Sequence, residues 1–171
     1  MSEGVIKVVG NKIFFHADVN DENVLELITI IHTMEHMKEV TIFIKSDGGD
    51  LYAGLSAMDH LSTSPIDITT VADGLCASSA SIILMGGDHR CMMPNARILI
   101  HQISSDFSGN FEEFKNERRN LKSLMRQVRR IYSEKTEIPD EELDKYMQKD
   151  IDLSSSKCVE YGIVECIYTN G

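Results

Sequence analysis

Three short polar motifs follow apolar segments of the chain, and each carries groups suited to acyl-transfer chemistry. Ser-Asp-Gly-Gly occupies positions 46–49, Gly-Leu-Cys-Ala-Ser-Ser-Ala-Ser occupies 74–81, and His101-Gln102 closes a third segment. Proteins of the α/β class usually expose reactive groups at the ends of their strands. A serine among small residues at a strand-to-helix turn is placed for nucleophilic attack, because the helix N-terminus offers backbone N–H groups to a developing oxyanion. Ser78 has this position.

A serine hydroxyl is a poor nucleophile near neutral pH until a histidine accepts its proton. Taken alone, the small residues around Ser78 more often indicate two backbones that pack closely, and Gly48-Gly49 alone indicates only a tight turn. The combination of the three motifs in one chain is what favours serine-based chemistry.

Alternating strands and helices must position these motifs. Strands are predicted at 12–16, 40–44, 66–71 and 97–101, and helices at 51–61, 78–85 and 141–147, the last leading to Asp150. A helix that Asn20 or Asp21 caps is predicted from apolar residues at every third or fourth position: Val24, Leu27, Ile28, Ile31 and Met34. A second such series, from Phe111 to Ile131, predicts one long helix that projects from the domain and ends before Pro139. The alternation predicts an α/β layered fold with a largely parallel, buried sheet.

Length and composition indicate a single folded domain over residues 1–171, with a short N-terminal segment at 1–11. The chain is 42% hydrophobic and 26% charged, which is ordinary for a globular protein. No segment has the length of apolar sequence that spans a bilayer, and the N-terminus does not resemble a signal peptide, so a cytoplasmic location is expected. The four cysteines form no CxxC pair and are expected to be reduced and mostly buried.

The distribution of charge excludes one class of partner and suggests another. A net charge of -10 argues against nucleic-acid binding, which needs a basic surface. Residues 110–135 nevertheless hold eight Lys or Arg against four Glu. Such a basic segment can meet an acidic surface on a neighbouring copy, although a solvated helix face is the commoner interpretation.

The motifs together resemble the proteolytic subunit of the Clp protease family. The family's serine lies in an Ala-Ser block, here Ala77-Ser78, and its histidine ends a block that here reads Pro94-Asn95-Ala96-Arg97-Ile98-Leu99-Ile100-His101-Gln102. The resemblance continues upstream in Ile44-Lys45-Ser46-Asp47-Gly48-Gly49 and downstream in Val159-Glu160-Tyr161-Gly162-Ile163-Val164. It covers most of residues 12–167.

The resemblance implies a Ser-His-Asp catalytic triad and a self-compartmentalised peptidase. It implies that Ser78 is the nucleophile, His101 the general base and Asp150 the orienting carboxylate, with an oxyanion hole formed by the backbone N–H groups of Gly49 and Ser79. The implied fold has repeated β-β-α layers of the type shared with the crotonase group, and a projecting handle strand and helix at 104–135. No cofactor is implied in the subunit, since ATP would be used by a partner ATPase.

The implied partners are further copies of the chain and an unfoldase. The family forms two stacked seven-membered rings, fed with peptides or unfolded proteins by an AAA+ unfoldase of the Clp type. In the family a longer N-terminal segment forms loops at the axial pore. Only eleven residues precede Lys12 here, so these loops are expected to be shortened or missing and coupling to the ATPase to be weaker.

Several residues depart from the family pattern near the proposed site. Asp47 replaces a proline of the glycine turn, and Ile103 replaces the proline after His-Gln. Ser79 and Ala80 replace the methionine and glycine that follow the nucleophile. Of the glycine-rich handle strand, only Gly109 is kept. A carboxylate at position 47 would disfavour a nearby oxyanion if it pointed inward.

Three alternatives compete with this interpretation. His32, Glu35 and His36 match the H-x-x-E-H pattern of zinc metallopeptidases, which place two histidines on one helical face. A crotonase-like fold can also serve as a non-catalytic or acyl-binding scaffold, because fold does not fix function. Finally, Cys76 is a possible nucleophile, although packing is its more natural role.

Overall fold

One mixed sheet organises the chain, and the computed structural model describes residues 4–104 and 106–169. Its strands are β1 (Val5–Val9), β2 (Lys12–His16), β3 (Glu39–Ser46), β4 (Asp67–Ala77), β5 (His89–Met92), β6 (Arg97–Leu99), β7 (Asp152–Leu153) and β8 (Cys166–Ile167). The order β1-β2-β3-β4-β5-β8 forms the main path, and β6 joins it through β4. Among the strands of the described residues, only the β1–β2 and β6–β7 pairs are antiparallel. The predicted α/β fold with a largely parallel sheet is confirmed.

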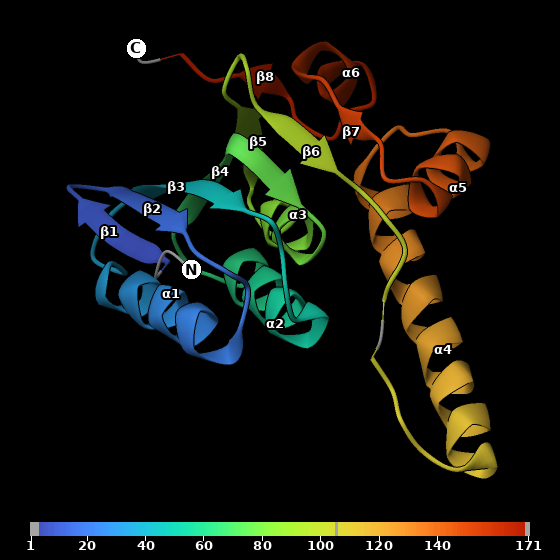
Figure 1. Cartoon of the computed structure of the whole chain (residues 1–171). Helices are drawn as coiled ribbons and strands as arrows, with labels where there is room; N and C mark the ends of the chain where they lie inside the picture. Colours follow the sequence, from blue (N-terminus) through green and yellow to red (C-terminus); the bar gives the residue numbers. More distant parts are fainter. Residues whose placement is uncertain (1–3, 105, 170–171) are drawn as a thin grey trace.

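Six helices accompany the sheet in the described residues. They are α1 (Asp21–Thr33), α2 (Leu51–Ser62), α3 (Ser79–Leu84), α4 (Phe111–Lys135), α5 (Asp140–Gln148) and α6 (Ser155–Glu160). Helices α1, α2 and α3 lie together on one side of the sheet, whereas α4 extends away from it (Figure 1). None of the helices in this part of the chain is long and apolar enough to cross a bilayer.

Side-chain caps explain where four of these helices begin. The side chains of Asn20, Asp50, Asn110 and Ser154 each accept a hydrogen bond from a backbone N–H of the first turn that follows. These first-turn groups have no acceptor within the helix, so a polar residue at the cap satisfies them. At Asn110 the arrangement is reciprocal, because the Glu113 side chain accepts from the Asn110 N–H.

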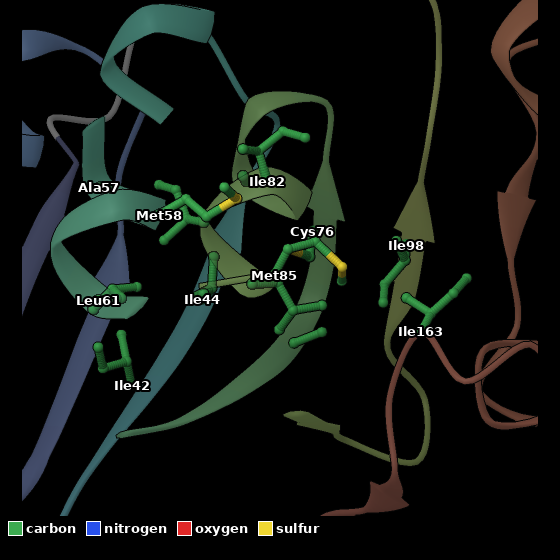
Figure 2. Packing of buried hydrophobic residues seen from close by; sticks show 14 of the residues in the cluster. Ile42, Ile44, Ala57, Met58, Leu61, Cys76, Ile82, Met85, Ile98 and Ile163 are labelled. Carbon is green, nitrogen blue, oxygen red and sulfur yellow. The ribbon is translucent and has the colours of Figure 1, made fainter. Parts of the chain in front are cut away.

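The main core fills the space between the sheet and the helices. Side chains from β3, such as Ile42 and Ile44, meet Met58 and Leu61 of α2 and Met85 at the end of α3 (Figure 2). The core takes in only the C-terminal half of α4, where Val128, Ile131 and Tyr132 are buried. The first half of α4 is therefore a projecting element, as its apolar stripe had predicted.

Strand β4 changes partners along its length, and this change builds the end of the sheet where the three polar motifs meet. Residues 69–72 pair with β5, and residues 75–77 pair with β6. The second pairing sets Ala77 opposite Leu99. It brings the turn after β4 next to the segment after β6, which leads to His101.

The two strands at the ends of the sheet's main path were not predicted. Strand β1 forms a hairpin with β2 through a turn at Gly10, whose positive φ of 61° suits glycine. Strand β8 lies parallel to β5. Residues 1–3 of the predicted N-terminal segment lie outside the described residues.

The cysteines differ from expectation, because Cys91 and Cys166 form a disulfide. The expectation of four reduced cysteines is therefore wrong for this pair. The two residues are direct neighbours on β5 and β8, with 4.9 Å between their Cα atoms, a separation that a disulfide can bridge. Spacing along the chain could not show this, because the two cysteines are 75 positions apart. Cys76 and Cys158 are free and buried.

The segment that leads into α4 carries no strand in its described part, residues 104 and 106–110. The handle strand expected there has no hydrogen-bonded neighbour among the strands of the sheet. A strand needs such a neighbour for its backbone N–H and C=O groups. Ser105 lies outside the described residues.

Candidate active site

Ser78 occupies a sharp turn between β4 and α3. Its φ of 55° and ψ of -129° make it the only residue other than glycine with positive φ in the described chain. Such a conformation costs about 1–3 kcal/mol and persists only where surrounding contacts impose it. Two contacts do so here. The Ser78 N–H donates to the Leu99 carbonyl at 2.9 Å, and the Ser78 carbonyl accepts from the Ser81 N–H at 2.9 Å.

The glycine turn after β3 packs directly against Ser78. A Cβ built on Gly48 would lie 2.6 Å from the Ser78 Cβ, so only glycine fits at this position. The Gly48 carbonyl accepts from the Val19 N–H at 2.9 Å. Because C=O and N–H point in opposite directions across one trans peptide, the N–H of Gly49 points away from Val19. Gly49 also lines the pocket that contains Ser78.

Ser78 and His101 line the same pocket, which has a volume of about 430 Å³. His101 is half-buried and lies two residues beyond β6. Its position follows from the pairing of β6 with the end of β4, since that pairing ties Leu99 to the serine turn. The structure thus brings together the predicted nucleophile and the predicted base.

Asp150 is exposed and lies between α5 and β7, outside the residues that line this pocket. Within the described chain, no hydrogen bond joins it to His101. The antiparallel pairing of β6 and β7 sets Leu99 opposite Asp152. The pairing ends there, so His101 and Asp150 each lie two residues beyond the paired strands. The chain turns at Asp150, where the Ile151 N–H donates to the Lys149 carbonyl at 2.9 Å.

The pocket has one apolar wall, which comes mainly from α4. Leu121, Leu124 and Val128 contribute to it, together with Ile82 of α3. The predicted apolar stripe of α4 therefore makes two kinds of contact. Its C-terminal end, at Ile131, packs in the core, and its middle, from Leu121 to Val128, faces the pocket. Tyr132 of α4 also lines the pocket. It was not identified from the sequence as a candidate site residue. A pocket of this size and polarity can hold a side chain of a bound peptide.

Two carboxylates, those of Asp47 and Asp50, lie on either side of the glycine turn that packs against Ser78. Asp47 is exposed and is not among the residues that line the pocket, so the concern that it points toward an oxyanion is not supported. Asp50 does line the pocket. Its side chain accepts from the Ala53 N–H at 2.8 Å, as the cap of α2.

Small residues after Ser78 also serve close packing between α2 and α3. A Cβ on Gly54 would come within 2.9 Å of the Ser79 carbonyl. These small residues therefore pack the two helices together, as the packing interpretation predicted, and Ser78 remains partly exposed. Ser79 is buried, lines the pocket and has a hydroxyl with no hydrogen-bond partner in the described structure.

The histidines of the H-x-x-E-H pattern do not share a helical face. Helix α1 ends at Thr33, before Glu35 and His36. His32 Nδ1 lies 2.7 Å from a Glu35 carboxylate oxygen, and His36 Nδ1 lies 3.1 Å from the Thr33 carbonyl. The described residues contain no group of three side chains that could hold a metal ion.

Cys76 is fully buried in the core near Ile98 and Ile163 (Figure 2). Burial raises the pKa of its thiol far above the usual value, with a smaller contribution from Cys158. Since the thiolate is the reactive form, this environment makes Cys76 inert. The pocket lining does not include it.

A serine on a strained strand-to-helix turn, a histidine in the same pocket and an α/β sheet define a candidate serine hydrolase. Residues 7–171 match the Clp protease family, and the chain belongs to this family. The resemblance seen in the sequence is confirmed. The chain is accordingly a proteolytic subunit of the serine endopeptidase type, and the matches favour this over the scaffold and zinc alternatives.

Individual relatives support the same assignment. The chain is 34% identical over 155 residues to a protein of Pleurastrum terricola, covering 88% of this chain and 79% of the relative. A protein of Chlorella vulgaris is 34% identical over 158 residues, covering 90% of this chain and 79% of the relative. One of Deinococcus radiodurans is 28% identical over 145 residues, covering 84% and 71%. Each of the three is named an ATP-dependent Clp protease proteolytic subunit.

Proposed function

We propose that Ser78, His101 and Asp150 form the catalytic triad of this endopeptidase. The observation that carries the proposal is that Ser78 and His101 line one pocket. The Ser78 Oγ attacks the carbonyl carbon of the peptide bond as His101 takes the hydroxyl proton. His101 then returns that proton to the leaving amine, and water releases the acyl group by the same steps. Asp150 orients the His101 ring and stabilises its protonated form.

The backbone N–H groups of Gly49 and Ser79 form the oxyanion hole in this proposal. Ser79 is the first residue of α3, so its N–H has no acceptor within the helix. The Gly49 N–H points away from Val19, as the Gly48–Val19 hydrogen bond requires. Two such donors stabilise the negative charge of the tetrahedral intermediate. The subunit needs no cofactor for these steps.

The assignment is tested by labelling with a fluorophosphonate, which modifies activated serines. Ser78→Ala should abolish labelling and lower kcat for a short peptide by roughly three orders of magnitude or more, with assembly unchanged. Ser104→Ala is the matched control, because Ser104 lines the same pocket and has no proposed catalytic role. Mass spectrometry of the adduct should identify Ser78. Labelling that persists in Ser78→Ala, or that moves to Cys76, would contradict the proposal.

The active form is proposed to be a homo-oligomer of two stacked seven-membered rings. Three aromatic residues at the start of α4 and just before it support association, since Phe107, Phe111 and Phe114 are 38%, 72% and 51% exposed. Clustered exposed aromatic side chains usually mark a contact surface. A second copy of the chain is the proposed occupant. The native mass tests this, and a fully active monomer of 19.2 kDa would contradict it.

A Clp-type AAA+ unfoldase is the proposed ATP-using partner, and the cytoplasm the proposed location. The relatives support the ATPase partner, because each is named an ATP-dependent Clp protease proteolytic subunit. Purified subunit should cleave short peptides but leave a stably folded, tagged protein intact. Addition of the unfoldase and ATP should start its degradation. Rapid degradation of the folded protein without the ATPase would contradict the self-compartmentalised assembly, in which the rings exclude folded proteins from the active sites.

A further inference from the structure

A buried hydrogen bond joins the helix that follows Ser78 to the long helix α4. The hydroxyl oxygens of Ser81 and Tyr132 lie 2.6 Å apart, and the residues are 51 positions apart in the chain. Ser81 is fully buried and Tyr132 is 2% exposed. Tyr132 also lines the active-site pocket. A polar pair this deeply buried fixes the relative position of the two elements that carry it.

The direction of this hydrogen bond follows from a second contact of Ser81. Its Oγ lies 2.6 Å from the Ser78 carbonyl oxygen, which can only accept. The single hydroxyl proton of Ser81 is therefore donated to Ser78, and Tyr132 must donate to Ser81. Burial raises the pKa of the Tyr132 hydroxyl well above its usual value, so the phenol keeps its proton for this bond. Tyr132 therefore donates a hydrogen bond to Ser81, and Ser81 donates one to the Ser78 carbonyl.

The carbonyl at the end of this chain belongs to the same peptide group as the Ser79 N–H. In a trans peptide the C=O and N–H point in opposite directions. When Ser81 holds the Ser78 carbonyl toward itself through both its N–H and its Oγ, the Ser79 N–H is turned the other way. Ser79 lines the pocket.

We propose that Tyr132 and Ser81 are positioning residues, which orient the peptide between Ser78 and Ser79 so that its N–H serves the oxyanion. This inference rests on the proposed oxyanion hole. The same contacts also explain how Ser78 keeps a φ of 55°, because they fix the peptide group that follows it. The hydrogen bond from the Ser78 N–H to the Leu99 carbonyl fixes the peptide group that precedes Ser78.

The test compares kcat and KM for a short fluorogenic peptide in the assembled protein. The variants are Tyr132→Phe, Ser81→Ala and the two combined, with kcat expressed per active site titrated by fluorophosphonate. Each single change should lower kcat about tenfold and leave KM within about twofold, because the hole stabilises the transition state more than the bound peptide. The combined variant should resemble Ser81→Ala, because the two residues act in series.

Tyr161→Phe is the matched control, since it removes a hydroxyl from another buried tyrosine that does not line this pocket. It should leave kcat unchanged. If Tyr132→Phe and Ser81→Ala also leave kcat per titrated site unchanged, the positioning role is overturned, even where thermal stability falls. Additive losses in the combined variant overturn it as well. The proposed function fails separately, through activity that survives in Ser78→Ala.

Discussion

The backbone N–H of Ser78 donates a hydrogen bond to the carbonyl of Leu99 at 2.9 Å. This bond joins the serine turn to the end of β6, and His101 follows two residues later. It therefore sets the distance between the two pocket residues through the backbone, without depending on a side-chain contact. The antiparallel pairing of Leu99 with Asp152 extends the same arrangement toward Asp150.

The family resemblance predicts that Asp150, and not the neighbouring Asp152, is the carboxylate of the triad. Asp150→Asn should lower kcat by roughly 10³-fold or more, because an amide cannot stabilise the protonated imidazole. Asp152→Asn is the control and should change kcat less than twofold, since Asp152 lies opposite Leu99 rather than His101. Steady-state hydrolysis of a short peptide measures both. A silent Asp150→Asn beside an inactive Asp152→Asn would show that the assignment is wrong by two residues.

Gly48 should tolerate no side chain. In Gly48→Ala the new Cβ would meet the Ser78 Cβ at 2.6 Å, at a residue whose φ is 101°. We expect fluorophosphonate labelling to slow by about 10²-fold as the serine shifts. Gly10→Ala is the control, because φ is 61° there but no atom lies within 4 Å. It should cost only about 1 kcal/mol of stability and leave labelling unchanged. Equal labelling rates in the two variants would contradict the close contact.

The sequence predicted the strands and helices whose residue pattern and capping residues lie within one short stretch of the chain. The strand at Lys12–His16 has the predicted bounds, and α2 begins at Leu51 because Asp50 caps it. The hairpin of β1 could have been found, since Gly10-Asn11 separates two runs rich in β-branched and aromatic residues. Strand β4 continues to Ala77, beyond its predicted end at Val71, because its last residues pair with β6.

Features that depend on distant partners could not be predicted in the same way. Strand β7 has only two residues, and it forms because it pairs with β6. The paired residues Leu99 and Asp152 are 53 positions apart in the chain. The bond between Ser81 and Tyr132 likewise needs the packing of α3 against α4. The family resemblance supplied Ser78, His101 and Asp150, whereas the wall of the pocket became visible only in the fold.

The hydroxyl of Ser79 should be dispensable. It is buried without a hydrogen-bond partner in the described structure, and such a group costs about 1–3 kcal/mol. Ser79→Ala should therefore raise the free energy of unfolding by about 1 kcal/mol and keep kcat within twofold, because the oxyanion hole uses the backbone N–H. Ser81→Ala makes the same change two residues away, where the hydroxyl is paired, and should lower kcat. A large loss of kcat in Ser79→Ala would show that its side chain contacts the substrate.

The disulfide between Cys91 and Cys166 should stabilise the edge of the sheet where β8 is attached. It closes a loop with a sequence separation of 75, for which the chain-entropy estimate is about 4 kcal/mol. Urea unfolding followed by far-UV circular dichroism should show a lower midpoint after reduction. Cys91→Ala is the control, because a reductant should not shift its midpoint further. Alkylation of the denatured, unreduced protein should modify only Cys76 and Cys158, the two free thiols. Modification of all four cysteines there would show that the disulfide is not formed.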